Sequence, residues 1–273
     1  MSKIAKSITS LKDVDTIYET LTEIFMKTHK LDRLRASIIA HMVLWEFYGQ
    51  FRSALKLLQV NKNYLREMLK EMDLALEMAD IIDSLGDKYR EINEVEMRLD
   101  EDYEQKTRML SSKITPDNVR LLSRLQFRRV RMASRFDLEY TPELYVKRRY
   151  AEEKFISFYD AVKSNLTGDK NLFLILADAG IGKTWLMAHL AEQLVTKGEI
   201  IFFIALREGF HRQMQTLFSR DIMDVFEVFE TMYKKYGYKI FVFLDGIDEL
   251  SSSEITDLLR WVAYARNKPY IAI

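Results

Sequence analysis

The hydrophobic and polar positions follow two different patterns along the chain. Up to about residue 135, apolar residues recur at steps of three and four, which places them on one face of a helix. Beyond that point, short unbroken apolar runs alternate with helical stretches, as in a parallel sheet with helices on both faces. Most of the nine glycines also lie in this last part. We therefore predict a helical N-terminal domain over residues 1–135, followed by an α/β domain over residues 136–273.

Two amphipathic helices are predicted at the start of the chain. They span Leu11 to Lys30 and Arg33 to Val60, with a turn near Leu31 and Asp32. The second helix carries an apolar stripe at helical spacing, typical of a core face: Leu44, Tyr48, Phe51 and Leu55.

A heptad pattern runs from Met78 to Leu110 and predicts a long helix. Only Glu96 and Lys106 interrupt it. The other seam positions are apolar or aromatic: Met78, Ile82, Leu85, Tyr89, Ile92, Leu99, Tyr103 and Leu110. We expect this helix to pack in an antiparallel bundle or hairpin, and a dimeric coiled coil is the alternative.

A helix rich in arginine is predicted from Asp117 to Arg135, just after Pro116. It contains one acidic residue and six arginines, which are Arg120, Arg124, Arg128, Arg129, Arg131 and Arg135. These side chains can pair with the acids between Asp100 and Glu104, or they can bind the phosphates of a nucleic acid. The planar guanidinium suits either partner.

The last part of the chain alternates strands and helices. The predicted strands are Leu172 to Ala177, Ile200 to Leu206, Ile240 to Leu244 and Tyr270 to Ile273. Helices are predicted over Tyr150–Lys163 and Lys183–Lys197, around residues 222–233, and after a capping box formed by Ser251 and Glu254. The fold class is thus α/β, with a parallel sheet truncated after the fourth strand. We expect the first strand to lie at an open edge, so that the sequence is a fragment of a longer polypeptide or another segment covers that edge.

A phosphate-binding loop is predicted between the first strand and its helix. Gly180 and Gly182 allow backbone conformations in which N–H groups turn toward phosphate oxygens, and the helix start adds its positive dipole end. The loop departs from the usual pattern at Ala177, where the first glycine would stand. The predicted nucleotide-binding residues of the loop are Ala177, Asp178, Ala179, Gly180, Ile181, Gly182, Lys183 and Thr184.

Within this loop, Lys183 is expected to reach the outer phosphates, and the Thr184 hydroxyl is expected to coordinate magnesium. A second apolar run, from Ile240, ends in acids as a Walker B strand does. Asp245 would lie at the carboxyl end of its strand and hold the magnesium ion, because open α/β sheets bind ligands at that edge. Asp248 is the first choice for orienting the attacking water, with Glu249 as the alternative. Together the two stretches predict a P-loop NTPase parallel sheet, and because the sequence stops in the fourth strand we expect the chain on its own to hydrolyse nucleotide barely, if at all.

The stretch Asp245-Gly246-Ile247-Asp248-Glu249 resembles the Walker B segment of the NACHT group within the STAND-class signalling ATPases. Residues 202–208, which end in Arg207-Glu208, are similar to the second strand of NACHT domains and the Arg-Glu that follows it. The resemblance covers Tyr140 to Ile273 and implies ATP with Mg²⁺. It also implies a base-contacting arginine before the loop, either Arg148 or Arg149, although Lys147 replaces the usual glycine.

Composition excludes several kinds of partner and site. The chain has 273 residues, 48% of them hydrophobic, and equal numbers (41 each) of basic and acidic residues, so the overall charge points to no polyanionic partner. The absence of cysteine excludes disulfides and thiolate metal sites, and the four histidines are not spaced as metal ligands. The start of the chain is not a secretory signal, and no apolar run is long enough for a membrane span, so a cytoplasmic protein is expected.

These observations predict a Mg-ATP-binding switch whose nucleotide state controls assembly, with self-association or a protein partner bound through the helical domain. Catalysis would rest on charge neutralisation by Lys183 and orientation of water by Asp248. One alternative is a DNA-binding replication or partition ATPase that uses the arginine-rich helix. Another is a helical adaptor with a degenerate nucleotide site.

Overall fold

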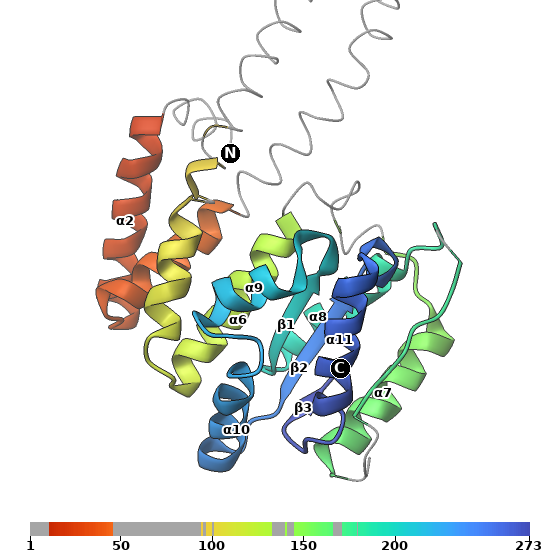
Figure 1. The fold of residues 1–273 in the computed structure, drawn as a ribbon. Coiled ribbons are helices and arrows are strands. Elements are labelled where there is room, and N and C mark those ends of the chain that lie inside the picture. Colours follow the sequence, from red (N-terminus) through yellow and green to blue (C-terminus); the bar gives the residue numbers. More distant parts are fainter. Residues whose placement is uncertain are drawn as a thin grey trace, which may run out of the picture. The chain divides into compact units, whose positions relative to one another are not determined.

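The computed structural model describes residues 11–45, 94, 97–99, 101–132, 140, 145–165, 171–178 and 180–273 (Figure 1). The chain forms two compact units, Met1–Tyr103 and Glu104–Ile273. The predicted domain boundary at residue 135 stays a prediction, and we describe each compact unit by itself.

The first unit is helical where it is described. Helix α2 (Leu11–His29) is followed by a helical stretch at residues 33–45, as the sequence predicts. Asp32 ends the turn between them and caps the second helix, because its carboxylate accepts a hydrogen bond from the backbone N–H of Arg35 at 2.9 Å. Leu44 of the predicted stripe is buried. The rest of that stripe (Tyr48, Phe51 and Leu55) lies outside the described residues.

Of the predicted heptad seam, Leu99, Tyr103 and Leu110 are buried. The other seam residues, Met78, Ile82, Leu85, Tyr89 and Ile92, lie outside the described part of the chain. The coiled coil therefore stays a prediction. Within the described residues, no helix is long and apolar enough to cross a membrane.

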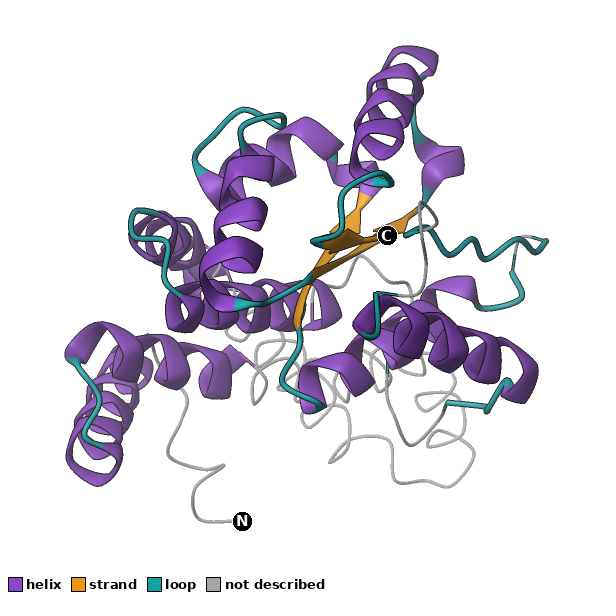
Figure 2. Ribbon diagram, turned by 90° about the horizontal axis from the view of Figure 1, so that it is seen from below, coloured by secondary structure: helices purple, strands orange, loops and turns teal. Residues whose placement is uncertain are grey.

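The second unit contains a parallel sheet with helices around it (Figure 2). Its main elements are α6 (Pro116–Met132), α7 (Arg149–Lys163), α8 (Lys183–Thr196), β1 (Ile200–Ala205), η2 (Leu206–Glu208), α9 (Phe210–Phe218), α10 (Val225–Tyr236), β2 (Ile240–Asp245), η3 (Ile247–Glu249), α11 (Ser252–Ala265) and β3 (Ile271–Ala272). The strands lie in the order β1-β2-β3 and all run parallel. The register pairs Ile200 with Ile240, and Ile240 with Ile271. The capping box of Ser251 and Glu254 is formed as predicted.

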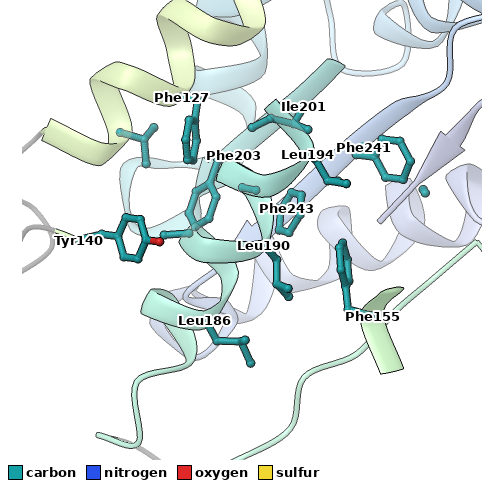
Figure 3. Packing of buried hydrophobic residues seen from close by; sticks show 14 of the residues in the cluster. Phe127, Tyr140, Phe155, Leu186, Leu190, Leu194, Ile201, Phe203, Phe241 and Phe243 are labelled. Carbon is teal, nitrogen blue, oxygen red and sulfur yellow. The ribbon is translucent and has the colours of Figure 1, made fainter. Parts of the chain in front are cut away.

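Both faces of this sheet are covered, which explains why its strands are continuous apolar runs. On one face, Phe203 and Phe243 stack at 5.9 Å and belong to a cluster with residues of α7 and α8, such as Phe155 and Leu190 (Figure 3). On the other face, Phe202 contacts aromatic rings of α9 and α10. The side chains of β1 and β2 thus alternate between two helical layers.

Helix α6 packs along the edge of β1 and replaces a neighbouring strand there. The side-chain amide of Gln126 accepts a hydrogen bond from the N–H of Phe203 at 3.0 Å and donates one to the carbonyl oxygen of the same residue. The Ser123 hydroxyl accepts a hydrogen bond from the N–H of Ile201 at 3.0 Å. These side chains satisfy backbone groups that an edge strand otherwise leaves free.

The predicted strand over Leu172–Ala177 is wrong in its extent, because residues 171–178 have no regular secondary structure. Only its start behaves as predicted. The N–H of Phe173 bonds the carbonyl oxygen of Ile273 at 2.8 Å, and the N–H of Ile273 bonds that of Asn171 at 2.9 Å. This segment therefore lies next to the end of β3, the position expected for the phosphate-loop strand. Past Phe173 none of the described residues pairs with this segment as a strand, and the apolar Leu174 and Leu176 are 61% and 87% exposed.

Candidate functional site

The predicted phosphate loop lies between the extended segment 171–178 and the first turn of α8. Gly180 and Gly182 both have positive φ angles, 79° and 78°, as their proposed role requires. Among the described residues, the non-glycine residues with positive φ are Lys30, Asn165 and Ser219. Ala177 is therefore unstrained where the usual pattern has glycine. Ala179 lies outside the described residues.

The Lys183 side chain folds back into the loop. Its ammonium group donates hydrogen bonds to the carbonyl oxygens of Ala177 at 2.7 Å and Asp178 at 3.0 Å. Gly182 is the N-cap of α8, so the first backbone N–H groups of a 14-residue helix point out of its start beside this ammonium group. A positive charge and a helix N-terminus together favour an anion.

Thr184 joins the loop to the end of β2. Its hydroxyl lies 3.1 Å and 2.9 Å from the two carboxylate oxygens of Asp245 and donates to them. Burial raises the pKa of Asp245; the Thr184 hydrogen bond opposes this rise, and the negative charges of Glu249 and Asp248 add to it. The structure thus brings the two predicted magnesium ligands together, at the carboxyl edge of the sheet.

The two candidate water-orienting acids follow on η3, and both are exposed. Gly246 has a φ of 82°, which turns the chain sharply after β2. A Cβ at that position would meet the Glu249 carboxylate at 3.3 Å, so Glu249 folds back over the turn. Of the two acids, Glu249 has the larger effect on the Asp245 carboxyl.

Arg148, one of the two arginines considered for the base contact, lies against the loop. Its guanidinium occupies the space beside Gly182, where an added Cβ would approach Nη2 to 2.7 Å. Arg149 begins α7 with an exposed side chain, and its predicted contact with nucleotide stays a prediction.

A polar network holds the segment that carries Arg148. The Glu152 carboxylate accepts hydrogen bonds from the Arg148 backbone N–H and the Tyr145 hydroxyl, both at 2.8 Å. Burial alone would raise the pKa of Glu152, but these two hydrogen bonds and the charges of His189 and Lys147 outweigh it and lower that pKa. The Tyr145 ring stacks on His189 of α8 at 4.0 Å. The network therefore ties the start of α7 to the phosphate-loop helix.

Two further charged groups beside the site were not among the predicted site residues. Arg207 follows β1, and its positive charge opposes the rise in the pKa of Asp245. Its neighbour Glu208 pairs with Arg129 of α6 at 3.4 Å, and both side chains are largely buried. The sequence signal for Arg207 was its position: it is a basic residue just past the carboxyl end of β1, the strand that pairs with β2.

The arginines of α6 are thus partly engaged in the fold. Besides the pair of Arg129 with Glu208, the guanidinium of Arg120 lies 4.5 Å from the ring centre of Tyr238. Arg124 is exposed. The side chains of Arg131 and Arg135 lie outside the described set, and the expected pairing with acids at 100–104 stays a prediction.

The residues present fit a hard cation such as Mg²⁺, because the donors at the junction are a hydroxyl and a carboxylate. In the part of the chain that the structure describes, no cluster of three or more His, Cys, Asp or Glu could hold a metal ion.

Residues 145–257 match the family model described as Type III restriction enzyme, res subunit. No curated protein and no solved structure matches the chain. The match covers the site and most of the sheet, and it supports a helicase-like P-loop NTPase domain in this part of the chain. It gives no support to the NACHT group in particular, so that resemblance stays a proposal.

Proposed function

We propose that this protein is a magnesium-dependent ATPase of the NACHT-like switch type, whose nucleotide state controls its assembly. The observation that carries the proposal is the junction between the phosphate loop and β2. There Lys183 lies within the loop, and Thr184 bonds Asp245 at the edge where parallel sheets bind ligands.

Each residue has a distinct role in this proposal. Lys183 would compensate the charge of the outer phosphates, while Thr184 and Asp245 would hold magnesium. Bound magnesium supplies further charge neutralisation at the phosphates. Asp248 orients the attacking water and accepts its proton. Arg148, beside Gly182, adds a second cation at the rim of the site.

The choice between Asp248 and Glu249 has a direct test. Asp248→Asn is expected to keep ATP binding and to slow hydrolysis by roughly 100-fold, within the usual contribution of a general base. Single-turnover hydrolysis with the chain in excess of ATP gives the rates, and Glu249→Gln is the matched control. If Glu249→Gln stops turnover while Asp248→Asn leaves it unchanged, Glu249 is the catalytic acid–base residue.

A second candidate is a nucleic-acid-dependent ATPase, and the family match favours it, because that family is named for a restriction enzyme subunit. The arginine-rich helix α6 supplies the basic side chains, and Arg124 is the exposed one among those described. Ion pairs to phosphate make such binding strongly salt-dependent.

Sedimentation of the purified chain separates the two candidates. We expect its assembly size to change between no nucleotide, Mg-ADP and Mg-ATP, and Lys183→Ala to abolish this response. Duplex DNA is expected to change neither the assembly size nor ATP turnover. Turnover accelerated by DNA, lost at high salt and in Arg124→Glu, would instead establish the nucleic-acid-dependent ATPase.

A further inference from the structure

The first turn of α7 holds the backbone of Arg148 at both of its polar groups. The Arg148 N–H donates to the Glu152 carboxylate at 2.8 Å, and the Glu152 N–H donates to the Arg148 carbonyl oxygen at 3.1 Å. Arg148 is the N-cap residue of this helix, and its own side chain makes no capping hydrogen bond. Glu152 therefore fixes the peptide groups on both sides of Arg148 and leaves the guanidinium to point elsewhere.

The Glu152 carboxylate is in turn held from α8. The Tyr145 hydroxyl donates to it at 2.8 Å, and the Tyr145 ring stacks on His189 with 4.0 Å between the ring centres. Both ring nitrogens of His189 have partners, the Tyr140 hydroxyl and the side-chain amide of Gln193, each at 2.9 Å. This chain of contacts joins the start of α7 to the helix that follows the phosphate loop.

The Arg148 guanidinium lies at the phosphate end of the candidate site. It occupies the space beside Gly182, the N-cap residue of α8, where an added Cβ would meet Nη2 at 2.7 Å. The Lys183 ammonium group lies within the same loop. Two cations at the positive end of a helix dipole are unfavourable by themselves, and an anion bound there compensates both. The arrangement therefore fits a phosphate group.

We propose that Glu152 is a positioning residue that holds Arg148 as the second phosphate-binding cation of the nucleotide site. This inference rests on the ATP site proposed above, and it assigns Arg148 to the phosphates rather than to the base. Arginine suits this role, because its planar fork can donate two parallel hydrogen bonds to one phosphate group. Loss of the Glu152 carboxylate would release the backbone N–H of Arg148 and allow its guanidinium to leave the loop.

A purely structural role for Glu152 gives a different expectation. If Glu152 only stabilised the start of α7, its loss would change nucleotide binding equally whether or not Arg148 is present. If Glu152 positions Arg148, the effect of losing Glu152 depends on Arg148. A double-mutant cycle separates the two roles, because it measures this dependence directly.

Calorimetric titration of the chain with Mg-ATP is the measurement. Arg148→Met removes the charge and keeps the length of the side chain, and we expect it to weaken binding about tenfold, as for the loss of one charged hydrogen-bonding partner. Glu152→Ala is expected to weaken binding about fivefold in the parent chain and by less than about twofold in the Arg148→Met background. Glu153→Ala, at an exposed position of the same helix, should bind like the parent.

A more conservative variant covers the case in which Glu152→Ala does not fold. Glu152→Gln keeps the volume of the side chain and one acceptor oxygen, which can serve only part of the two hydrogen bonds that the carboxylate accepts. We expect its affinity to lie between those of the parent and Arg148→Met, again with little effect in the Arg148→Met background. An equal loss in both backgrounds would assign Glu152 to stability alone and overturn the proposal.

Inorganic triphosphate is the second probe, since it carries the phosphates without the base. We expect Arg148→Met to weaken its binding by the same factor as the binding of Mg-ATP. A loss confined to Mg-ATP would assign Arg148 to the base and overturn the proposal.

Lys183→Ala separates this inference from the proposed function. If Lys183→Ala weakens Mg-ATP binding while Arg148→Met leaves it unchanged, the phosphate loop stands, and the roles of Arg148 and Glu152 are wrong. If Lys183→Ala leaves binding unchanged, or the parent chain binds no Mg-ATP, the proposed function is wrong and this inference with it.

Discussion

Lys183 donates hydrogen bonds to two backbone carbonyl groups of the loop, and these contacts position its ammonium group inside the loop. We expect Lys183→Ala to weaken ATP binding by roughly 100-fold, about 2.7 kcal/mol, because the variant leaves the phosphate charge without its cation. Calorimetric titration with Mg-ATP measures the change. Lys235→Ala, on the exposed side of α10, should bind like the parent chain. Unchanged affinity in Lys183→Ala would remove the phosphate-loop assignment.

The ionised Asp245 carboxylate is expected to lower the free energy of unfolding near neutral pH, and its proposed role at the magnesium site explains why the chain keeps it. Burial raises its pKa in the folded chain above the ordinary value of 3.8. A carboxyl of this kind stabilises the fold while protonated, and that contribution is lost as the pH rises through the raised pKa. We therefore expect Asp245→Asn to have a higher free energy of unfolding than the parent at pH 7.

The gain from Asp245→Asn should shrink as the pH falls toward 3.8, where the parent carboxyl is itself protonated. Urea unfolding at several pH values checks this, with Asp160→Asn on the exposed side of α7 as the control. The same Asp245→Asn variant should lose magnesium-dependent nucleotide binding. A variant that is less stable than the parent at pH 7 would contradict this account of Asp245.

Single residues of the site were predictable where the chemistry is local. The order of glycines, lysine and threonine identified Lys183 and Thr184, and the end of an apolar run identified Asp245. Arg148 and Arg149 could not be separated, because their directions depend on where α7 begins, and one residue turns a helical side chain by about 100°.

At the level of elements, the edge of β1 depends on one amide. Gln126 bonds both backbone groups of Phe203, and its side chain is buried. We expect Gln126→Leu to lower the free energy of unfolding by about 2–4 kcal/mol, because two buried backbone groups lose their partner. Denaturant unfolding measures the loss. Arg124→Ala, exposed on the same helix, should stay within about 0.5 kcal/mol of the parent; a similar loss in both variants would contradict a specific role for Gln126.

The elements that sequence predicted well are those with local signals. The Ser251 and Glu254 capping box fixes the start of α11, and the apolar runs fix β1 and β2. The segment 172–177 has the same apolar composition, yet most of it forms no strand, since pairing depends on a neighbour far along the chain. Gln126 gave no sequence signal, because a buried glutamine on a helix reveals its partner only once the helix lies on β1.

At the scale of the whole molecule, the packing of α6 along the edge of β1 limits the number of sides on which the sheet can pair with a strand of another copy. Among the described residues, Ser123 and Gln126 bond backbone groups of Ile201 and Phe203 on the outer side of β1, so the side of the sheet left to a further strand is the one bounded by residues 171–176. If each copy has one unpaired edge, two copies can pair edge to edge as a symmetric dimer, and the assembly then stops. A variant without the contacts of Ser123 and Gln126 to β1 has two unpaired edges. Contacts between unlike edges can repeat without closure, as in a fibre. The two side chains Ser123 and Gln126 thereby separate a molecule whose association ends at two copies from one whose association can continue indefinitely.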